Sequence, residues 1–153
     1  MSIHSLKQEQ RNSMSSIPQE MKSDEAKKLF IILSTGMQDA GKKATLAFSA
    51  ACSALALDKS VSVFLIGDGV VWADQNITKE IITPGFPPLD SLIDNYIEFG
   101  GHLAMCSACA SDEGACGIEE YRLLKSPSLR AEVQVQGFAT IMENVFSGSN
   151  LSF

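Results

Sequence analysis

Three short apolar runs are spaced along the chain, and each ends at a polar or glycine-containing turn. They occupy residues 28–34 (KLFIILS), 61–66 (VSVFLI) and 102–105 (HLAM). Runs of this length and composition favour strands that are buried on both faces, as in a parallel sheet. Such a sheet needs helices on both faces, so the runs point to an α/β fold.

The segments between the runs have the apolar spacing of helices. Residues 40–57 are rich in small residues, which predicts a helix packed closely on the sheet, and residues 89–99 predict a second helix. Residues 130–136 alternate valine with polar residues, as expected of a fourth strand, and residues 137–146 predict a closing helix. The order of strand, helix and strand implies right-handed βαβ connections. We therefore expect a three-layer α/β/α sandwich with a mainly parallel sheet of four to five strands. The face expected to be buried in the first helix is formed by Leu46, Ala50, Ser53, Ala54 and Leu57.

Two further segments and one cysteine complete this description. Residues 83–88 are rich in proline, which predicts an exposed loop that could cover a site. Residues 117–124 predict another helix, which Pro127 would end. Cys52 lies within the first helix, and because free cysteines are often buried we expect it to face the core.

Length and composition fit one globular domain. The chain has 153 residues, of which 45% are hydrophobic and 20% are charged. We assign residues 1–25, which are rich in Ser, Gln, Lys and Glu, to a flexible tail and residues 26–153 to the domain. The net charge of −6 and the dispersed basic residues argue against nucleic-acid binding.

The sequence favours a cytoplasmic protein without a membrane span. No apolar segment approaches the roughly 20 residues that a membrane span needs. The first 23 residues lack the apolar core of a secretory signal. In the cytoplasm the four cysteines should be reduced, so catalysis or metal binding is expected before disulfide formation.

Residues 100–117 contain three of the four cysteines. Cys106 falls where a strand should end, and the carboxyl ends of strands are where ligands and chemistry gather in open α/β sheets. The thiolate is the nucleophilic form of cysteine, and a helix N-terminus favours it. If a helix begins at Ser107, Cys106 meets this condition, and we expect it to be the most reactive and most accessible thiol. Cys109 lies three residues on and could form a disulfide with it.

A metal site is the second interpretation of the same stretch. His102, Cys106, Cys109 and Cys116 are four ligands of the zinc type, and Cys-x-x-Cys is a common half-site. However, His102 and Cys106 on one strand would lie roughly 13 Å apart, from a rise of about 3.3 Å per residue. We expect His102 to be a partly buried, hydrogen-bonded residue at the start of the strand. Purely structural cysteines remain a further alternative.

A phosphate-binding loop is the third interpretation, based on residues 36–43. They match G-x-x-x-x-G-K, but Lys43 stands where a magnesium-binding Ser or Thr is required. Asp39 would also bring negative charge among the phosphates. A helix start, with Asp39 near the N-terminus, is the favoured interpretation.

Several stretches in this order and spacing resemble the DsrE/DsrF-like family of sulfur-relay proteins, which includes the TusD-type subunits. The resemblance covers about residues 28–146 and implies a parallel α/β sheet, assembly into trimers or hexamers, and a cysteine that carries sulfur as a persulfide. Only Cys106 matches the sulfur-carrying position of the family, whereas Cys109 and Cys116 are additional. The stretches are residues 28–34, 63–70, 103–106, 117–118 and 133–138.

The resemblance implies a cytoplasmic sulfur carrier with the activity of a sulfurtransferase and without a cofactor. Cys106 would attack a donor persulfide and pass the outer sulfur to a partner protein's thiol, alone or with Cys109. Sulfur donor and acceptor proteins are the expected partners. A homotrimer or homohexamer is also expected, because the apolar residues 70–72 and Phe86 would be hard to cover in a small monomer. The alternative is a non-catalytic assembly subunit with a Cys/His zinc site or structural cysteines.

Overall fold

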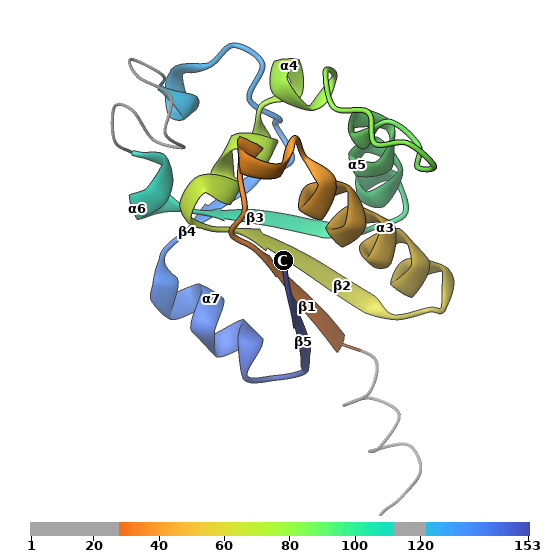
Figure 1. Ribbon diagram of the computed structural model, residues 1–153. Coiled ribbons are helices and arrows are strands. Elements are labelled where there is room, and N and C mark those ends of the chain that lie inside the picture. Colours follow the sequence, from red (N-terminus) through yellow and green to blue (C-terminus); the bar gives the residue numbers. More distant parts are fainter. Residues whose placement is uncertain (1–27, 112–121) are drawn as a thin grey trace, which may run out of the picture.

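The computed structural model describes residues 28–111 and 122–153 (Figure 1). Five strands form one all-parallel sheet in the order β4-β3-β2-β1-β5. The predicted α/β fold is therefore confirmed, and the sheet has the upper number of strands expected. The strands are β1 (Lys28–Leu33), β2 (Ser60–Leu65), β3 (His102–Cys106), β4 (Gln134–Gln136) and β5 (Ser149–Ser152).

Helices cover both faces of the sheet. The helices α3 and α5 pack side by side on one face, and of the described helices α7 covers the opposite face (Figure 1). The chain crosses the sheet between β4 and β5 by way of α7, since these two strands are the two edges. The helical segments are η1 (Met37–Asp39), α3 (Lys42–Ala56), η2 (Gly67–Ala73), α4 (Gln75–Thr78), α5 (Leu89–Glu98), α6 (Ser107–Ala110), η4 (Leu123–Lys125) and α7 (Phe138–Val145), where η marks a 3-10 helix.

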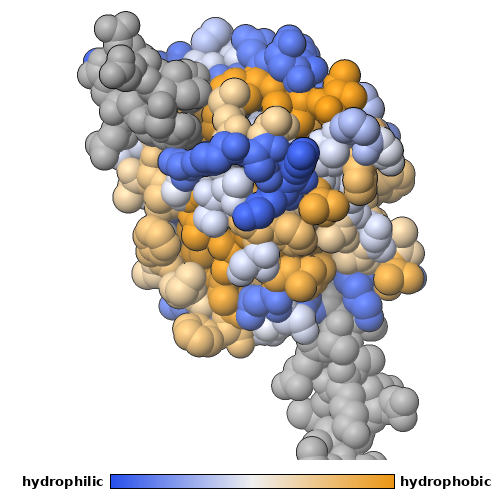
Figure 2. All heavy atoms as spheres, viewed as in Figure 1, coloured by the Kyte–Doolittle hydropathy of each residue, from blue (hydrophilic) through white to orange (hydrophobic). Residues whose placement is uncertain are grey.

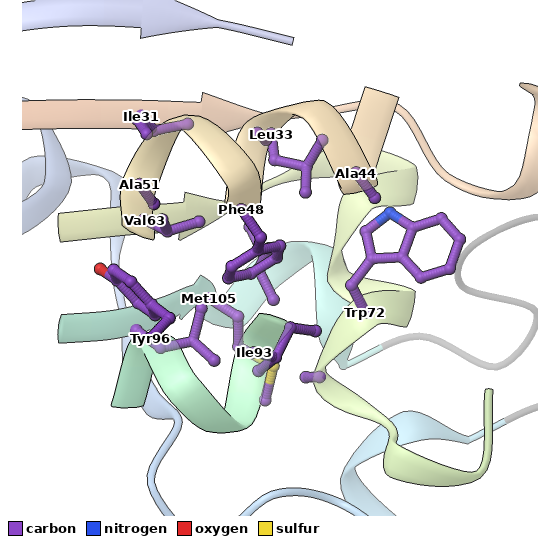
Figure 3. Close-up of a cluster of buried hydrophobic side chains, with 14 of the residues drawn as sticks. Ile31, Leu33, Ala44, Phe48, Ala51, Val63, Trp72, Ile93, Tyr96 and Met105 are labelled. Carbon is purple, nitrogen blue, oxygen red and sulfur yellow. The ribbon is translucent and has the colours of Figure 1, made fainter. Parts of the chain in front are cut away.

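The larger core lies between the sheet and the α3–α5 layer (Figure 3). Alternate residues of the central strands point into it, including Ile31 and Val63, which are fully buried. Phe48 of α3 meets Tyr96 of α5 edge to face, with ring centroids 5.6 Å apart. Burying each of these large side chains contributes about 1.5–3 kcal/mol. This layer therefore accounts for most of the buried apolar surface.

A smaller core lies on the other face of the sheet, under α7. Phe30 of β1 and Phe64 of β2 stack with centroids 5.9 Å apart. Ala104, Cys106 and Ile141 complete this cluster, and Ile141 is the buried residue of α7. The last residue of β3 is thus packed beneath a single helix.

The face of α3 expected to be buried is only partly correct, because Ala54 is buried and Ala50 packs against the core but the two leucines are exposed. Leu46 is 43% exposed and Leu57 is 70% exposed, whereas Ala47 and Ala51 are fully buried. Small side chains face the sheet because the helix packs close to it, and this leaves the larger leucines to solvent. Phe48 fills the remaining space toward α5.

Other expectations are refined in the same way. The apolar residues 70–72, expected to need cover from another subunit, lie in η2 and are fully buried within the chain. The fourth strand is shorter than expected, β4 covering Gln134–Gln136, and β5 adds an edge strand next to β1. The segment expected as a helix over 117–124 is described only in part, where it contributes to η4, and residues 117–121 lie outside the described residues.

No helix in the described part of the chain is long and apolar enough to cross a membrane.

Candidate functional site

Cys106 is the last residue of β3 and the N-cap of α6. The predicted arrangement of a strand end followed directly by a helix is therefore present (Figure 1). Contrary to the expectation of an accessible thiol, Cys106 is fully buried. It belongs to the cluster under α7, together with Phe64 and Ile141. The physical reason is that α7, which follows more than thirty residues later in the sequence, covers this face of the sheet.

Cys109 is the third residue of α6 and is half-buried. Its thiol lies close enough to the Cys106 side chain and to the backbone N–H of Gly67 for both to influence its pKa. Burial raises the pKa of the Cys109 thiol, and the neighbouring Cys106 side chain acts in the same direction. The N–H groups of Gly67 and of Cys109 itself lower this pKa, but the net shift is upward. The two thiols therefore form one pair, with Cys109 on its outer side.

The carboxyl ends of β1 and β2 approach each other closely beside this pair. The positive φ of Gly67, +55°, turns the chain from β2 into η2, which contacts α6. A Cβ atom on Gly69 would lie 2.1 Å from the carbonyl oxygen of Leu33, which leaves room only for glycine there. This tight packing holds the Gly67 N–H next to α6.

His102 lies at the opposite end of β3 from Cys106. Its Nε2 atom is 2.8 Å from Oε1 of Gln134 on β4, and its side chain is half-buried. The expected hydrogen-bonded histidine at a strand start is therefore present. Within residues 28–111 and 122–153 no three His, Cys, Asp or Glu side chains are grouped to hold a metal. Cys116, the fourth ligand considered for zinc, lies outside the described residues.

The glycine-rich turn over residues 36–43 is a helix start. The Asp39 carboxylate accepts hydrogen bonds from the backbone N–H groups of Gly41 at 3.1 Å and Lys43 at 2.9 Å. These are the groups that would bind a phosphate, and a carboxylate already occupies them. Gly41 also has a positive φ of +83°, and a Cβ there would meet Ile81 at 2.4 Å. The turn is thus explained by helix capping and packing.

A buried polar cluster, missed in the sequence, joins residues 126–130 to Asp74 and to α5. Asp74 is 3% exposed and accepts from the hydroxyl groups of Ser126, at 2.9 Å, and Ser128. The Arg130 guanidinium is buried and pairs with Asp90 and, at 2.6 Å, with Asp94. The sequence offers no periodic signal for these contacts, because they join residues 36 to 54 positions apart.

Cys52 packs against the larger core, as expected, but it is less buried than expected. It is half-buried and lines a cavity of about 300 Å³ between α3 and α5, where its thiol donates to the carbonyl oxygen of Leu92 at 3.5 Å. Burial raises the pKa of the Cys52 thiol. The prediction of a poorly reactive cysteine agrees with this direction, although the residue belongs to a surface cavity. The other lining residues are Leu55, Ala56, Leu92, Asn95 and Phe99.

Comparisons of the sequence and of the fold with known proteins identify the family to which the chain is similar. The model of the DsrE/DsrF-like family matches residues 27–151. Among solved structures, the YchN protein from E. coli is similar with a TM-score of 0.56 and 14% sequence identity, over 83% of this chain and 99% of that chain. A conserved protein of unknown function from Bacteroides thetaiotaomicron is similar with a TM-score of 0.54 and 16% identity, over 83% of this chain and 95% of that chain. None of the curated proteins matches significantly in sequence.

Proposed function

We propose a function from one established premise: the chain belongs to the DsrE/DsrF-like family, whose members are generally sulfur-relay proteins. The proposed function is that of a sulfur carrier, which holds a sulfur atom as a cysteine persulfide and passes it to the thiol of a partner protein. The observation that carries this proposal is the pair of thiols at the carboxyl end of β3. The family resemblance implies that Cys106 is the sulfur-carrying residue, and the Cys109 thiol is its neighbour in the first turn of α6.

The chemistry of the proposal needs only thiols. A thiolate attacks the outer sulfur of a donor persulfide, a new S–S bond forms, and the donor leaves as a thiolate. The reverse exchange on an acceptor thiol unloads the carrier. Electrons are conserved in each exchange, so no cofactor is required. The free state of Cys106 and Cys109 is compatible with such exchange.

A macromolecular donor and acceptor are part of the proposal, and exposed apolar residues on α7 and β5 support it. Phe138 is 49% exposed and Phe146 is 86% exposed at the two ends of α7, and Leu151 on β5 is 44% exposed. Figure 2 shows hydrophobic surface gathered over α7, in the view of Figure 1. Large apolar groups of this kind mark interaction sites. We propose that this surface serves assembly into a homotrimer or homohexamer, or docking of a sulfur-transfer partner.

The test is the mass of the intact protein after incubation with glutathione persulfide, compared with untreated protein. We expect a gain equal to one sulfur atom that a reductant removes, and peptide mapping should locate it on Cys106. Metal content is measured on the same sample. A protein that gains no sulfur and contains zinc in equal amount would contradict the proposal and would support the alternative of a zinc-binding subunit.

A further inference from the structure

We propose that Cys109 is the thiol through which sulfur enters, and that Cys106 is the thiol that stores it. The inference rests on the proposed sulfur-carrier function and assigns different roles to the two cysteines. It reverses the order expected from the sequence, in which Cys106 meets the donor directly.

Access to solvent separates the two thiols. Cys106 is fully buried in the cluster under α7, and Cys109 is half-buried on α6. Sulfur exchange requires the attacking sulfur to reach the sulfane sulfur within roughly 3–3.5 Å and in line. Cys109 packs against both cores but remains partly exposed, whereas a donor can approach Cys106 only after the residues that bury it have moved. The outer thiol is therefore the first to meet a donor.

Contact between the thiols supplies the second step. Cys106 is the N-cap of α6 and Cys109 is three residues on, in the first turn of that helix. The Cys106 side chain influences the pKa of the Cys109 thiol, as expected of two neighbouring thiols in this backbone conformation. A sulfur atom on Cys109 is thus delivered next to the Cys106 sulfur.

The two steps balance without an oxidant or reductant. First, the Cys109 thiolate attacks the outer sulfur of the donor R–S–SH, giving Cys109–S–SH and R–S⁻. Second, the Cys106 sulfur attacks the same sulfane sulfur, the bond to Cys109 breaks, and Cys106–S–SH forms. The proton of the Cys106 thiol ends on the Cys109 sulfur. The sulfane sulfur keeps its oxidation state throughout.

The apolar surroundings of Cys106 fit storage, whereas Cys109 reacts through the minor thiolate fraction that its raised pKa leaves at neutral pH. The backbone N–H of Gly67 acts to lower the pKa of Cys109, which stabilises the negative charge on Cys109 when it leaves in the second step. Phe64, Ala104 and Ile141 surround Cys106 with apolar groups. A persulfide stored there is shielded from small thiols in solution.

The experiment uses the full chain with Cys52→Ser and Cys116→Ser, so that only the pair remains, and compares it with its Cys109→Ser and Cys106→Ser derivatives. Each protein is incubated with glutathione persulfide, and sulfur uptake is followed by intact mass. Dithiothreitol is then added, and the loss of sulfur is timed. Wild-type protein is measured in parallel, and thermal unfolding checks that each variant is folded.

We expect Cys109→Ser to load at least tenfold more slowly than its parent, because sulfur can then enter only through a local opening that exposes Cys106. A tenfold slower rate corresponds to an opening free energy of about 1.4 kcal/mol. Cys106→Ser should load one sulfur on Cys109 at the parent's rate and lose it to dithiothreitol at least tenfold faster, on the same opening argument. Cys109→Ala replaces Cys109→Ser if the serine variant does not fold.

Three results would overturn the assignment. Loading of Cys109→Ser at the parent's rate would mean that Cys106 meets the donor directly. Failure of Cys106→Ser to load would mean that Cys109 does not receive sulfur. Formation of a Cys106–Cys109 disulfide with release of sulfide would mean that the pair discharges sulfur and does not store it. If neither the parent nor wild-type protein takes up sulfur, the proposed function itself is wrong.

Discussion

Ile141 allows a direct test of whether α7 is the cover of Cys106. It is 1% exposed and belongs to the same cluster as Cys106, whereas its neighbour Met142 on the same helix is 36% exposed. Replacing a buried isoleucine by alanine costs about 2–5 kcal/mol, because apolar contacts are lost and a cavity remains. Met142→Ala removes a half-solvated side chain, so we expect it to cost less than about 1 kcal/mol.

The change should appear in the chemistry of Cys106 as well as in stability. Ile141→Ala weakens the attachment of α7 to the sheet, and each 1.4 kcal/mol lost from a local opening equilibrium raises the open population about tenfold. If Ile141→Ala lowers the free energy of this local opening by about 2–4 kcal/mol, alkylation of Cys106 by iodoacetamide should accelerate by about one to three orders of magnitude. Met142→Ala should leave this rate within about threefold of wild type.

The assay combines urea unfolding with timed alkylation and peptide mass analysis, in a Cys109→Ser background so that Cys106 is scored alone. Equal stability losses in Ile141→Ala and Met142→Ala would refute the packing argument. A destabilised Ile141→Ala variant with unchanged Cys106 alkylation would show that the opening which exposes this thiol does not involve α7.

Three further predictions concern other parts of the molecule. Arg130→Met should lower the free energy of unfolding, measured with urea, by about 3–5 kcal/mol, because it leaves the partly buried Asp90 without its cation. Asp94→Asn should cost under about 1 kcal/mol, because the Asp94 side chain is 54% exposed. Similar losses in the two variants would contradict this prediction. Gly69→Ala should lower the melting temperature strongly, because the added Cβ would lie 2.1 Å from the carbonyl oxygen of Leu33. Gly137→Ala should be neutral, because no non-neighbouring atom lies within 4 Å of the Cβ it adds. An unchanged melting temperature in Gly69→Ala would count against the close approach of the two turns. Burial raises the pKa of Cys109, and this burial is kept in a Cys106→Ser protein. The alkylation rate of Cys109 in that protein should therefore still be rising with pH above the ordinary pKa of 9.0. A plateau of the rate below pH 9.0 would contradict the direction of the shift.

The sequence predicted the strands of the sheet because buried parallel strands are marked by continuous apolar runs, as in β1 and β2. It did not mark β5, since the four residues of this edge strand are exposed and largely polar. Periodicity also misassigned Leu46, because a helix packed closely on a sheet buries its small residues. Local pattern therefore identified the centre of the fold better than its edges.

The position of Cys106 at a strand end was predictable from the apolar run that precedes it and the glycines around it. Its burial was not, because the residues that cover it belong to α7, far along the chain. The pairing of Asp74 with Ser126 and Ser128 was invisible for the same reason, as these partners are more than 50 residues apart. The candidate thiols thus follow from local sequence, whereas their accessibility is a property of the tertiary structure.

The placement of β5 beside β1 also affects how the protein is made. Ser34 and Phe153 are 119 positions apart in sequence, yet the backbone N–H of Ser34 donates to the carbonyl oxygen of Phe153 at 2.9 Å. During synthesis, β1 has no partner on its β5 side until residues 149–153 have emerged from the ribosome. The face of the sheet that carries Cys106 is likewise not covered by α7 until that helix has emerged. Contacts between residues so distant in sequence slow folding. The newly made chain therefore passes through a period in which the thiol that is later enclosed is exposed to oxidants and to other thiols in the cell.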